Sequence, residues 1–255
     1  MTGRGGGLVR PRLDERLLSL GLCHDLHEAR GRVMSGQVLV DDRPVVKAGT
    51  RPPTGASIRL RDERGHPWVS RGGVKLEHAI RSWEIPVDGR VCLDIGASTG
   101  GFTEVLLSHG ARQVHAVDVG YGLLAWKLRR DPRVVIHDRV NVRHVGAGFL
   151  PEPATLATLD VSFISLALAL PPILPLLHPG SPGIALVKPQ FEADRDEVGP
   201  GGVIDSESTL ERVLRRVTSM VQGLGLEIRP LLPSPIPGPA GNREYLLHFR
   251  KPDGP

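Results

Sequence analysis

The stretch "LDIGASTGGFTE", residues 93–104, decides the fold of this chain of 255 residues. Apolar residues lead into Asp94, a run of small residues follows, and "FTEVLLSHG" then repeats apolar residues at helical spacing. The stretch therefore predicts a buried strand, a turn on glycines and the start of a helix. In a sheet of parallel strands, such a turn lies at the carboxyl edge, where ligands bind.

Strand and helix patterns alternate on either side of this turn. The strand patterns are "RVCLDIG", "QVHAVDV", "VVIHD", "LATLDVSF", "GIALVKP" and "EYLLHF", and the helix patterns include "GGVKLEHAIRSW", "LLAWKLRRD" and "STLERVLRRVTSMVQGLG". This alternation predicts an α/β domain over residues 70–250, built on a doubly wound, Rossmann-like parallel sheet and followed by a tail at residues 251–255.

The first quarter of the chain has a different pattern. Residues 11–64 read as two short helices followed by three strands, which predicts a small α+β domain. The glycine-rich residues 1–10 are expected to be disordered, and residues 65–69 are expected to form a linker.

Basic residues are concentrated at the amino-terminal end. Residues 1–80 hold 14 Lys and Arg against 9 Asp and Glu, a net of +5, whereas the remaining residues hold 18 against 19, a net of −1. A basic module beside a near-neutral domain is typical of a protein that docks on a polyanion and works with a second domain. A chance imbalance in an arginine-rich chain is the alternative that charge alone leaves open.

The composition argues against several other classes of protein. The longest apolar run, residues 163–177, is short for a membrane span and holds Pro171, Pro172 and Pro175. No secretory signal is visible, so a cytoplasmic protein without membrane contact is expected. Cys23 and Cys92 lie far apart and are expected to be reduced and buried, and the ten histidines form no metal-ligand motif.

The glycine turn does not match the motifs that bind dinucleotides or triphosphates. Ser98 stands where the second glycine of G-x-G-x-x-G would be, and no Gly-Lys-Ser/Thr follows. Small residues beside an acidic strand end suit a positively charged nucleoside without phosphates, and S-adenosylmethionine has these properties. Asp94 is expected near its ammonium and sulfonium groups, and Asp118 near its ribose hydroxyls. A tight turn with no ligand stays open as the alternative.

Several segments, in their order along the chain, resemble the TlyA family of ribosomal RNA 2′-O-methyltransferases, some of which are called hemolysins. They are "VSRGGVKLEHAI", "LDIGASTGGFTEVLL", "VDVGYGLLAWKLRRDPRV", "LDVSFISL", "VKPQFE" and "GNREYL". "RLDERLLSLGL" and "EARGRVMSGQVLVDDRPV" similarly resemble the RNA-binding domain of small-subunit ribosomal protein four. The resemblance implies an FtsJ-like class I methyltransferase domain that uses S-adenosylmethionine on ribosomal RNA or assembled ribosomal subunits. Cytidine is the expected target, and a monomer or weak oligomer is expected.

The resemblance also implies a catalytic tetrad at Lys75, Asp160, Lys188 and Glu244. A lysine at a strand end can act as a base toward a ribose hydroxyl or steady the developing alkoxide, and the two acids would orient the two lysines. No metal is required. The predicted cofactor-binding residues are Asp94, Gly96, Ser98, Gly100, Gly101, Phe102, Asp118 and Asn141, and the predicted RNA-binding residues are Arg12, Arg16, Arg30, Arg32 and Arg43.

Taken one at a time, the tetrad residues have simpler explanations. Lys188 could be solvated at a strand end, Asp160 could cap the next helix, Glu244 could be a surface charge on an edge strand, and Lys75 could be an exposed helix residue. Four flanking positions also depart from the family pattern, which leaves the target site on the RNA open. They are Glu104, Val140, Asp194 and Pro200.

Two other functions remain as alternatives. One is a ribosome-binding factor that keeps the fold but does no chemistry, against which the intact tetrad counts. The other is a membrane-active hemolysin, which would need an export signal and a membrane-inserting stretch, and neither is visible in the sequence. The sequence does not name the modified nucleotide or the ribosomal subunit.

Overall fold

The computed structural model describes residues 10–41, 43–60, 66–199 and 201–253. The chain divides into two compact units, Met1–Gly65 and His66–Pro255. Of the expected disordered segment, residues 1–10, residues 1–9 are not among the described residues. The same holds for Gly65, the first residue of the expected linker. Trp68, which was expected in the linker, packs against the core of the second unit.

The first unit is a small α+β structure, as its sequence pattern predicts. Two helices pack against a three-stranded antiparallel sheet of order β2-β1-β3. Its core is built from leucines and small apolar residues that recur at helical spacing. Leu13, Leu17, Ala29, Val33 and Val38 are fully buried. The elements are α1 (Leu13–Ser19), α2 (Leu26–Met34), β1 (Val38–Val40), β2 (Arg43–Pro44) and β3 (Ile58–Leu60).

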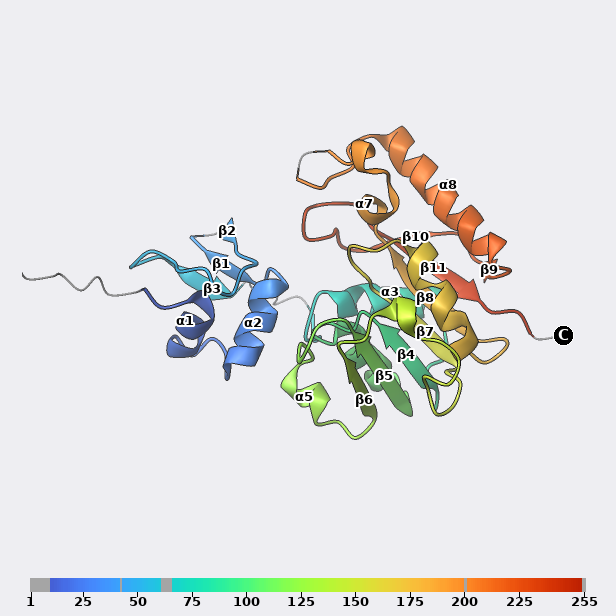
Figure 1. Ribbon diagram of the computed structural model, residues 1–255, viewed down its shortest axis with the longest axis horizontal. Helices are drawn as coiled ribbons and strands as arrows, with labels where there is room; N and C mark the ends of the chain where they lie inside the picture. Colours follow the sequence, from blue (N-terminus) through green and yellow to red (C-terminus); the bar gives the residue numbers. More distant parts are fainter. Residues whose placement is uncertain (1–9, 42, 61–65, 200, 254–255) are drawn as a thin grey trace, which may run out of the picture. The chain divides into compact units, whose positions relative to one another are not determined.

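The second unit is built on an eight-stranded, mostly parallel sheet (Figure 1). Its order is β10-β11-β8-β7-β4-β5-β6, with β9 paired to β11, and β11 runs antiparallel to β8. The strands are β4 (Val91–Ile95), β5 (Gln113–Asp118), β6 (Val134–Asp138), β7 (Leu156–Leu159), β8 (Pro182–Val187), β9 (Glu227–Ile228), β10 (Leu232–Pro233) and β11 (Tyr245–Arg250). The predicted doubly wound α/β fold is therefore confirmed.

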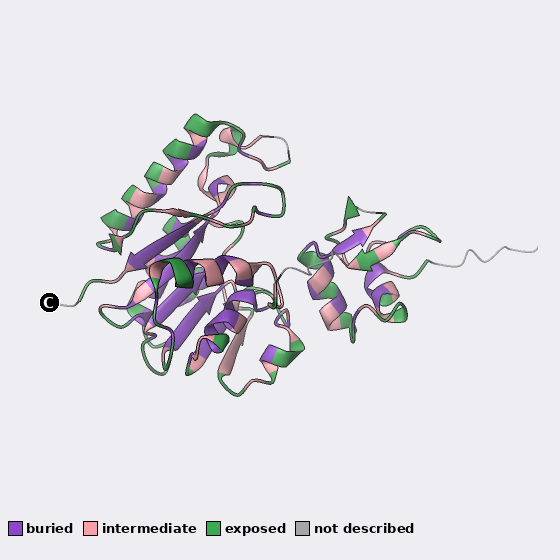
Figure 2. Ribbon diagram, turned by 180° about the vertical axis from the view of Figure 1, so that it is seen from behind, coloured by how far each residue is buried: buried purple, intermediate pink, exposed green. Residues whose placement is uncertain are grey.

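Helices cover both faces of this sheet. They are α3 (Gly72–Trp83), α4 (Gly101–Ser108), α5 (Trp126–Arg129), η1 (Val142–His144), α6 (Leu166–Ala169), η2 (Pro171–Leu176), α7 (Pro189–Glu192), η3 (Arg195–Glu197) and α8 (Glu207–Gly223). One core joins the sheet to α6, η2 and α8, and another joins it to α3 and α4. Figure 2 shows the buried strands between these layers and the exposed outer face of α8.

Alternation along the strands explains the two cores. In β4, Leu93 and Ile95 belong to one core and Cys92 to the other, because successive strand residues face opposite sides of a sheet. Both faces are covered, so the strand reads as a continuous apolar run interrupted only by Asp94. Among the described residues, no helix is long and apolar enough to span a membrane.

Candidate active site

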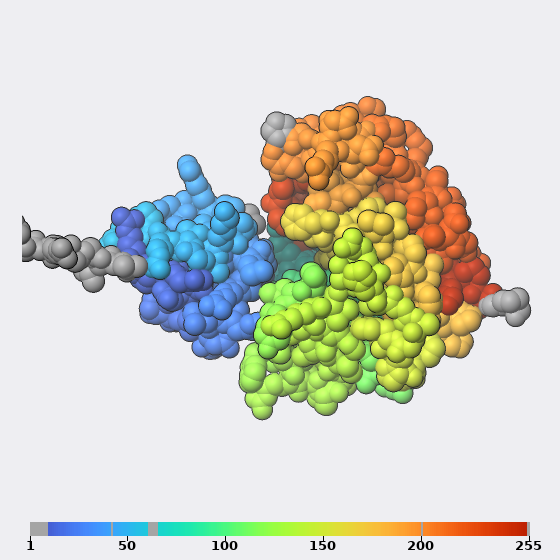
Figure 3. Space-filling model, in the orientation of Figure 1, coloured from blue at the N-terminus to red at the C-terminus, as the bar shows by residue number. Residues whose placement is uncertain are grey.

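The carboxyl ends of neighbouring parallel strands bring the predicted site residues to one edge of the sheet. The turn at residues 96–100 follows β4, and Asp118 ends β5. Asp160 directly follows β7, and Lys188 directly follows β8. The surface of the second unit is hollowed in Figure 3 beside its teal segment, between the green, yellow and red segments.

Lys188 and Asp160 form an ion pair at this edge. The Lys188 Nζ lies 2.7 Å from Asp160 Oδ1 and donates a hydrogen bond of 2.8 Å to Ser162 Oγ. Burial alone would raise the pKa of Asp160, but the positive charges of Lys188 and Lys75 outweigh it and lower that pKa below its ordinary value. Asp160 is therefore a carboxylate at neutral pH.

Lys75 and Glu244 form a second, more deeply buried pair. Lys75 projects from α3, Glu244 directly precedes β11, and their side chains are 8% and 0% exposed. Lys75 Nζ donates to Glu244 Oε2. Glu244 Oε1 is buried and has no hydrogen-bond partner in the described part of the chain. A charged group this far from water is tolerated only because its partner is beside it.

The two ion pairs belong to one cluster. The charge of Lys75 contributes to the lowered pKa of Asp160, which already pairs with Lys188. The structure thus brings the four predicted tetrad residues together from α3, the end of β7, the end of β8 and the start of β11. None of the four is an isolated surface charge, although their catalytic roles remain predictions.

The glycine turn allows three segments to approach closely. Gly96 has a φ of +79°, and a Cβ there would lie 2.4 Å from the carbonyl oxygen of Asp160. A Cβ on Gly101 would lie 2.2 Å from Ser70 Oγ, and one on Gly100 would lie 2.2 Å from Leu128 Cδ1. The glycines are needed for contacts within the protein, and this does not depend on a ligand.

Asp94 is buried beneath the glycine turn. Its side chain is fully buried and accepts hydrogen bonds from Thr103 Oγ1 at 2.6 Å and Thr158 Oγ1 at 2.9 Å. Burial raises the pKa of Asp94 to about 6. The position of Asp94 near the ammonium and sulfonium groups of the methyl donor stays a prediction. The carboxylate ties α4 and β7 to the strand that precedes the turn.

Asp118 and Ser98 remain accessible at the same edge. Ser98 donates its backbone N–H to Asp118 Oδ2 at 2.8 Å, and Gly120 donates to Oδ1 at 2.7 Å. A carboxylate has about four acceptor sites, so roughly two remain for ribose hydroxyls. Asn141 is partly exposed and caps η1 by accepting from the backbone N–H of Arg143 at 3.0 Å. Phe102, in contrast, is buried in the core.

The residues at this edge offer polar groups to which an adenosine group could bind. Asp118 supplies acceptors for ribose hydroxyls, and the backbone of the turn supplies a close approach at Gly96 and Ser98, which are not buried. The described residues contain no group of three or more His, Cys, Asp or Glu that could hold a metal ion.

Phe163 is an exposed apolar residue that the sequence reading did not single out as a site residue. Phe163 is 90% exposed, and its backbone φ is +63°. Its ring lies 5.0 Å from that of Phe191, which in turn lies 6.0 Å from Lys188 Nζ. A bulky residue with positive φ is strained and is typical of a functional position. In the sequence, the feature that could have pointed to Phe163 is its place three positions after Asp160, a predicted catalytic acid.

Two more exposed aromatic rings follow β5, each close to an arginine. Tyr121 is 64% exposed and lies 4.2 Å from the Arg139 guanidinium carbon, measured from the ring centroid. Trp126 is 65% exposed, and its ring centroid lies 5.5 Å from the guanidinium carbon of Arg130. Aromatic rings and arginines on one surface are the groups on which unpaired nucleotides stack.

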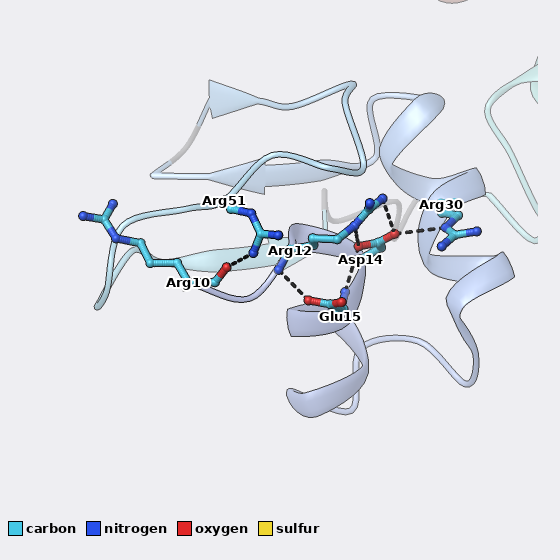
Figure 4. Close-up of polar contacts among 6 residues, drawn as sticks. All are labelled: Arg10, Arg12, Asp14, Glu15, Arg30 and Arg51. Atoms are coloured by element: carbon cyan, nitrogen blue, oxygen red, sulfur yellow. Dashed lines mark hydrogen bonds and ion pairs between the residues drawn. The ribbon is translucent and has the colours of Figure 1, made fainter. Parts of the chain in front are cut away.

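The arginines predicted to bind RNA in the first unit do not all have free charges. Arg12 and Arg30 both bind the fully buried carboxylate of Asp14, each from Nε at 3.0 Å (Figure 4). Burial alone would raise the pKa of Asp14, but the hydrogen bonds from these two arginines lower it. They therefore support the fold of this unit, whatever they do toward RNA.

The other predicted RNA-binding arginines differ in how far they are paired. Arg32 pairs with Glu28 at 2.8 Å, and Arg16 donates to the carbonyl oxygen of Pro53 at 3.1 Å. Arg43 is exposed on β2. Within the described residues, neither Arg43 nor Arg16 belongs to an ion pair, so both charges are available to a phosphate.

Known proteins resemble the whole chain. Residues 68–251 match the model of the FtsJ-like methyltransferase family. The chain is 42% identical over 241 residues to the 16S/23S rRNA (cytidine-2′-O)-methyltransferase TlyA of Mycobacterium tuberculosis, covering 94% of this chain and 90% of the relative.

Solved structures resemble the chain as well. A protein from Streptococcus thermophilus, assigned as a hemolysin, is 40% identical with a TM-score of 0.74, covering 98% of this chain and 91% of that one. A Listeria monocytogenes protein, assigned as an S-adenosylmethionine-dependent methyltransferase, shares the fold at 15% identity with a TM-score of 0.53, covering 72% of this chain and 100% of that one.

Proposed function

The chain belongs to the family of FtsJ-like methyltransferases, and on this premise we propose that it methylates the ribose 2′-hydroxyl of a cytidine in ribosomal RNA. The observation that supports this most strongly is the cluster of two ion pairs at the edge where the methyl donor is expected, the buried pair of Lys75 with Glu244 and the partly buried pair of Lys188 with Asp160. A binding factor without chemistry would have no need for four charges in this arrangement, because burying them is costly.

Lys188 is the group that we assign to the ribose oxygen. Its ammonium has three N–H donors, one of which bonds to Ser162, and it forms an ion pair with Asp160. A remaining N–H can donate to the 2′ oxygen and stabilise the negative charge that develops there during attack. In its neutral form the same amine would instead accept the hydroxyl proton while the carbon–sulfur bond of the donor breaks.

Lys75 and Glu244 position this pair. Lys75 is almost fully buried and its charge acts on Asp160, while Glu244 fixes Lys75 in place. S-adenosylmethionine would supply a methyl group activated by its sulfonium, held through Asp118 and the turn at Gly96 and Ser98. Holding both reactants at this edge would account for much of the rate enhancement.

Phe163 is suited to hold the base of the target nucleotide. Enzymes that modify a nucleotide in folded RNA expose it to the active site and stack its base on an aromatic side chain. Phe163 is highly exposed, lies against Phe191, and is three residues from Asp160. Tyr121 and Trp126 are further exposed aromatic residues of the second unit on which nucleotides could stack.

Transfer of a tritiated methyl group to ribosomal RNA tests this assignment. We expect Lys188→Ala to retain less than a tenth of the wild-type rate while donor affinity, measured by calorimetry, is unchanged, because the lysine acts in the transition state. Arg215→Ala, on the exposed face of α8, is the control and should transfer methyl normally. A Lys188→Ala variant that transfers methyl above a tenth of the wild-type rate would remove Lys188 from the chemistry.

A further inference from the structure

A second polar cavity lies at the opposite edge of the sheet. It has a volume of about 240 Å³, and Arg90, Arg229, Arg250, His248 and Trp83 contribute to its wall. Arg90 directly precedes β4, and Arg250 at the end of β11 pairs in register with Pro182 at the start of β8. Lys188 follows the other end of β8, which at about 3.3 Å per residue is roughly 20 Å away. The methyl-donor site and this cavity are therefore separate.

The wall of the cavity holds three arginines and one carboxylate, that of Glu84. The charge of Arg250 is balanced by its ion pairs with Asp253 at 2.9 Å and Glu227 at 3.5 Å. Arg90 donates to the carbonyl oxygen of Thr155. Within the described part of the chain, Arg90 and Arg229 are thus the arginines of the wall that form no ion pair.

His248 adds a polar group that lacks a partner. The residue is 7% exposed, and its Nδ1 is buried without a hydrogen bond in the described part of the chain. Its ring lies 5.4 Å from that of Trp83. Burial, reinforced by the charge of Arg229, lowers the pKa of His248 to about 4, so the imidazole is neutral at pH 7. The ring of His248 therefore lines the cavity without adding charge.

These observations select the chemistry of a ligand. A cation would be repelled by Arg90 and Arg229, and an apolar group would leave their guanidinium groups without an ion-pair partner. An oxyanion satisfies them, because planar guanidinium groups bind phosphate oxygens in pairs. The volume is below the range of about 300–1,000 Å³ that encloses a drug-sized molecule, so a phosphate group fits better than a whole nucleotide cofactor.

We infer that the cavity between α3 and the amino ends of β4 and β8 is a phosphate-binding site, with Arg229 and Arg90 as its main ligands. The phosphate is either a free ion or part of an RNA backbone that continues past the cavity. This site is independent of the methyl-transfer assignment, since the donor binds at the other edge of the sheet.

Calorimetry with two probes tests the inference on the full chain, in a buffer free of phosphate and sulfate. The probes are inorganic phosphate and a single-stranded RNA of about ten nucleotides. Arg229→Gln is the variant of choice because Arg229 is exposed and its loss breaks no ion pair of the described residues. Arg215→Gln, from a surface pair on α8, is the matched control. We expect saturable binding to the wild type that is weakened about tenfold or more by Arg229→Gln and unchanged by the control.

The two probes separate the possible sources of the phosphate. An Arg229-dependent signal with inorganic phosphate supports a site for a free ion, and one with RNA alone supports a backbone contact. If neither probe binds the wild type, or if Arg229→Gln binds both as the wild type does, the inference is overturned. S-adenosylmethionine affinity, measured in parallel, should be equal in all three proteins, and its loss in Arg229→Gln would contradict the separation of the two sites.

Discussion

Removing the charge of Lys75 while keeping Glu244 should destabilise the second unit strongly. The two side chains are 8% and 0% exposed and bind each other directly. A buried ion that loses its partner costs about 3–5 kcal/mol. In a unit of this size, each kcal/mol shifts the melting temperature by about 2–4 °C. We therefore expect Lys75→Met to lower the melting temperature of the second unit by roughly 6–20 °C.

A double variant separates the electrostatic cost from the loss of packing. Lys75→Met/Glu244→Leu removes both charges, and an apolar replacement of a buried pair is often neutral or stabilising. We expect it to recover most of the stability lost in Lys75→Met while methyl transfer stays absent in both. Arg81→Met is the control on the same helix, because Arg81 is 77% exposed in its pair with Glu77 and should cost at most about 1 kcal/mol.

Tryptophan fluorescence during heating and in urea is the assay. Trp68, Trp83 and Trp126 are the three tryptophans of the chain, and all lie in the second unit, so the signal reports that unit alone. A loss below about 1 kcal/mol in Lys75→Met would refute the reasoning. A double variant no more stable than the single one would refute it as well, because the cost would then come from packing.

Three further outcomes are expected. Asp118→Ala should weaken S-adenosylmethionine binding about tenfold or more in calorimetry, whereas Asp131→Ala, whose carboxylate pairs with neighbouring Arg133, should not; equal affinities would remove Asp118 from the donor site. Burial raises the pKa of Asp94 from 3.8 to about 6, so the folded state binds the extra proton. Wild-type stability should therefore fall relative to Asp94→Asn by about 2 kcal/mol as pH rises from 4 to 6, and parallel curves would contradict this. Arg43 and Lys47 are exposed basic residues of the first unit, and Arg43→Ala/Lys47→Ala should lower RNA affinity and reduce the salt slope by about 0.9 per phosphate contact, with unchanged stability. Arg12→Ala/Arg30→Ala should instead unfold the first unit by leaving Asp14 unpaired, and the reverse result would show that the paired arginines do the docking.

The sequence was sufficient to predict the layers of the second unit, because both local signals and chain order pointed the same way. The amphipathic pattern before the last strand became α8, and the apolar runs that end in Asp160 and Lys188 became β7 and β8. A parallel sheet brings such strand ends together, so the meeting of these two residues also followed from the pattern. The antiparallel placement of β11 beside β8 could not be predicted in this way, since strand order depends on packing across the whole sheet.

Local structure was harder to predict where long-range contacts decide it. "LLAWKLRRD" has helical spacing over nine residues, but α5 covers only Trp126–Arg129. Asp94 reads as a ligand-binding acid from its place before a glycine turn, yet Thr103 and Thr158 take up its oxygens from 9 and 64 residues away. Partners at such separations leave no local signal in the sequence.

The same limit applies to charge in the first unit. Counting residues revealed an excess of arginine, but it did not reveal that Asp14 is buried between Arg12 and Arg30. Charge composition therefore predicted a basic module and overestimated how many of its arginines are free to meet a phosphate.

Nucleoside analysis of ribosomal RNA tests the methyl-transfer assignment most directly. Ribosomal subunits from cells that lack the gene would be incubated with the protein and S-adenosylmethionine carrying a labelled methyl group, and the RNA would then be digested to nucleosides. We expect the label in 2′-O-methylcytidine with the wild-type protein and none with Lys188→Ala. Label in a base-methylated nucleoside, or no label from either ribosomal subunit, would contradict the assignment.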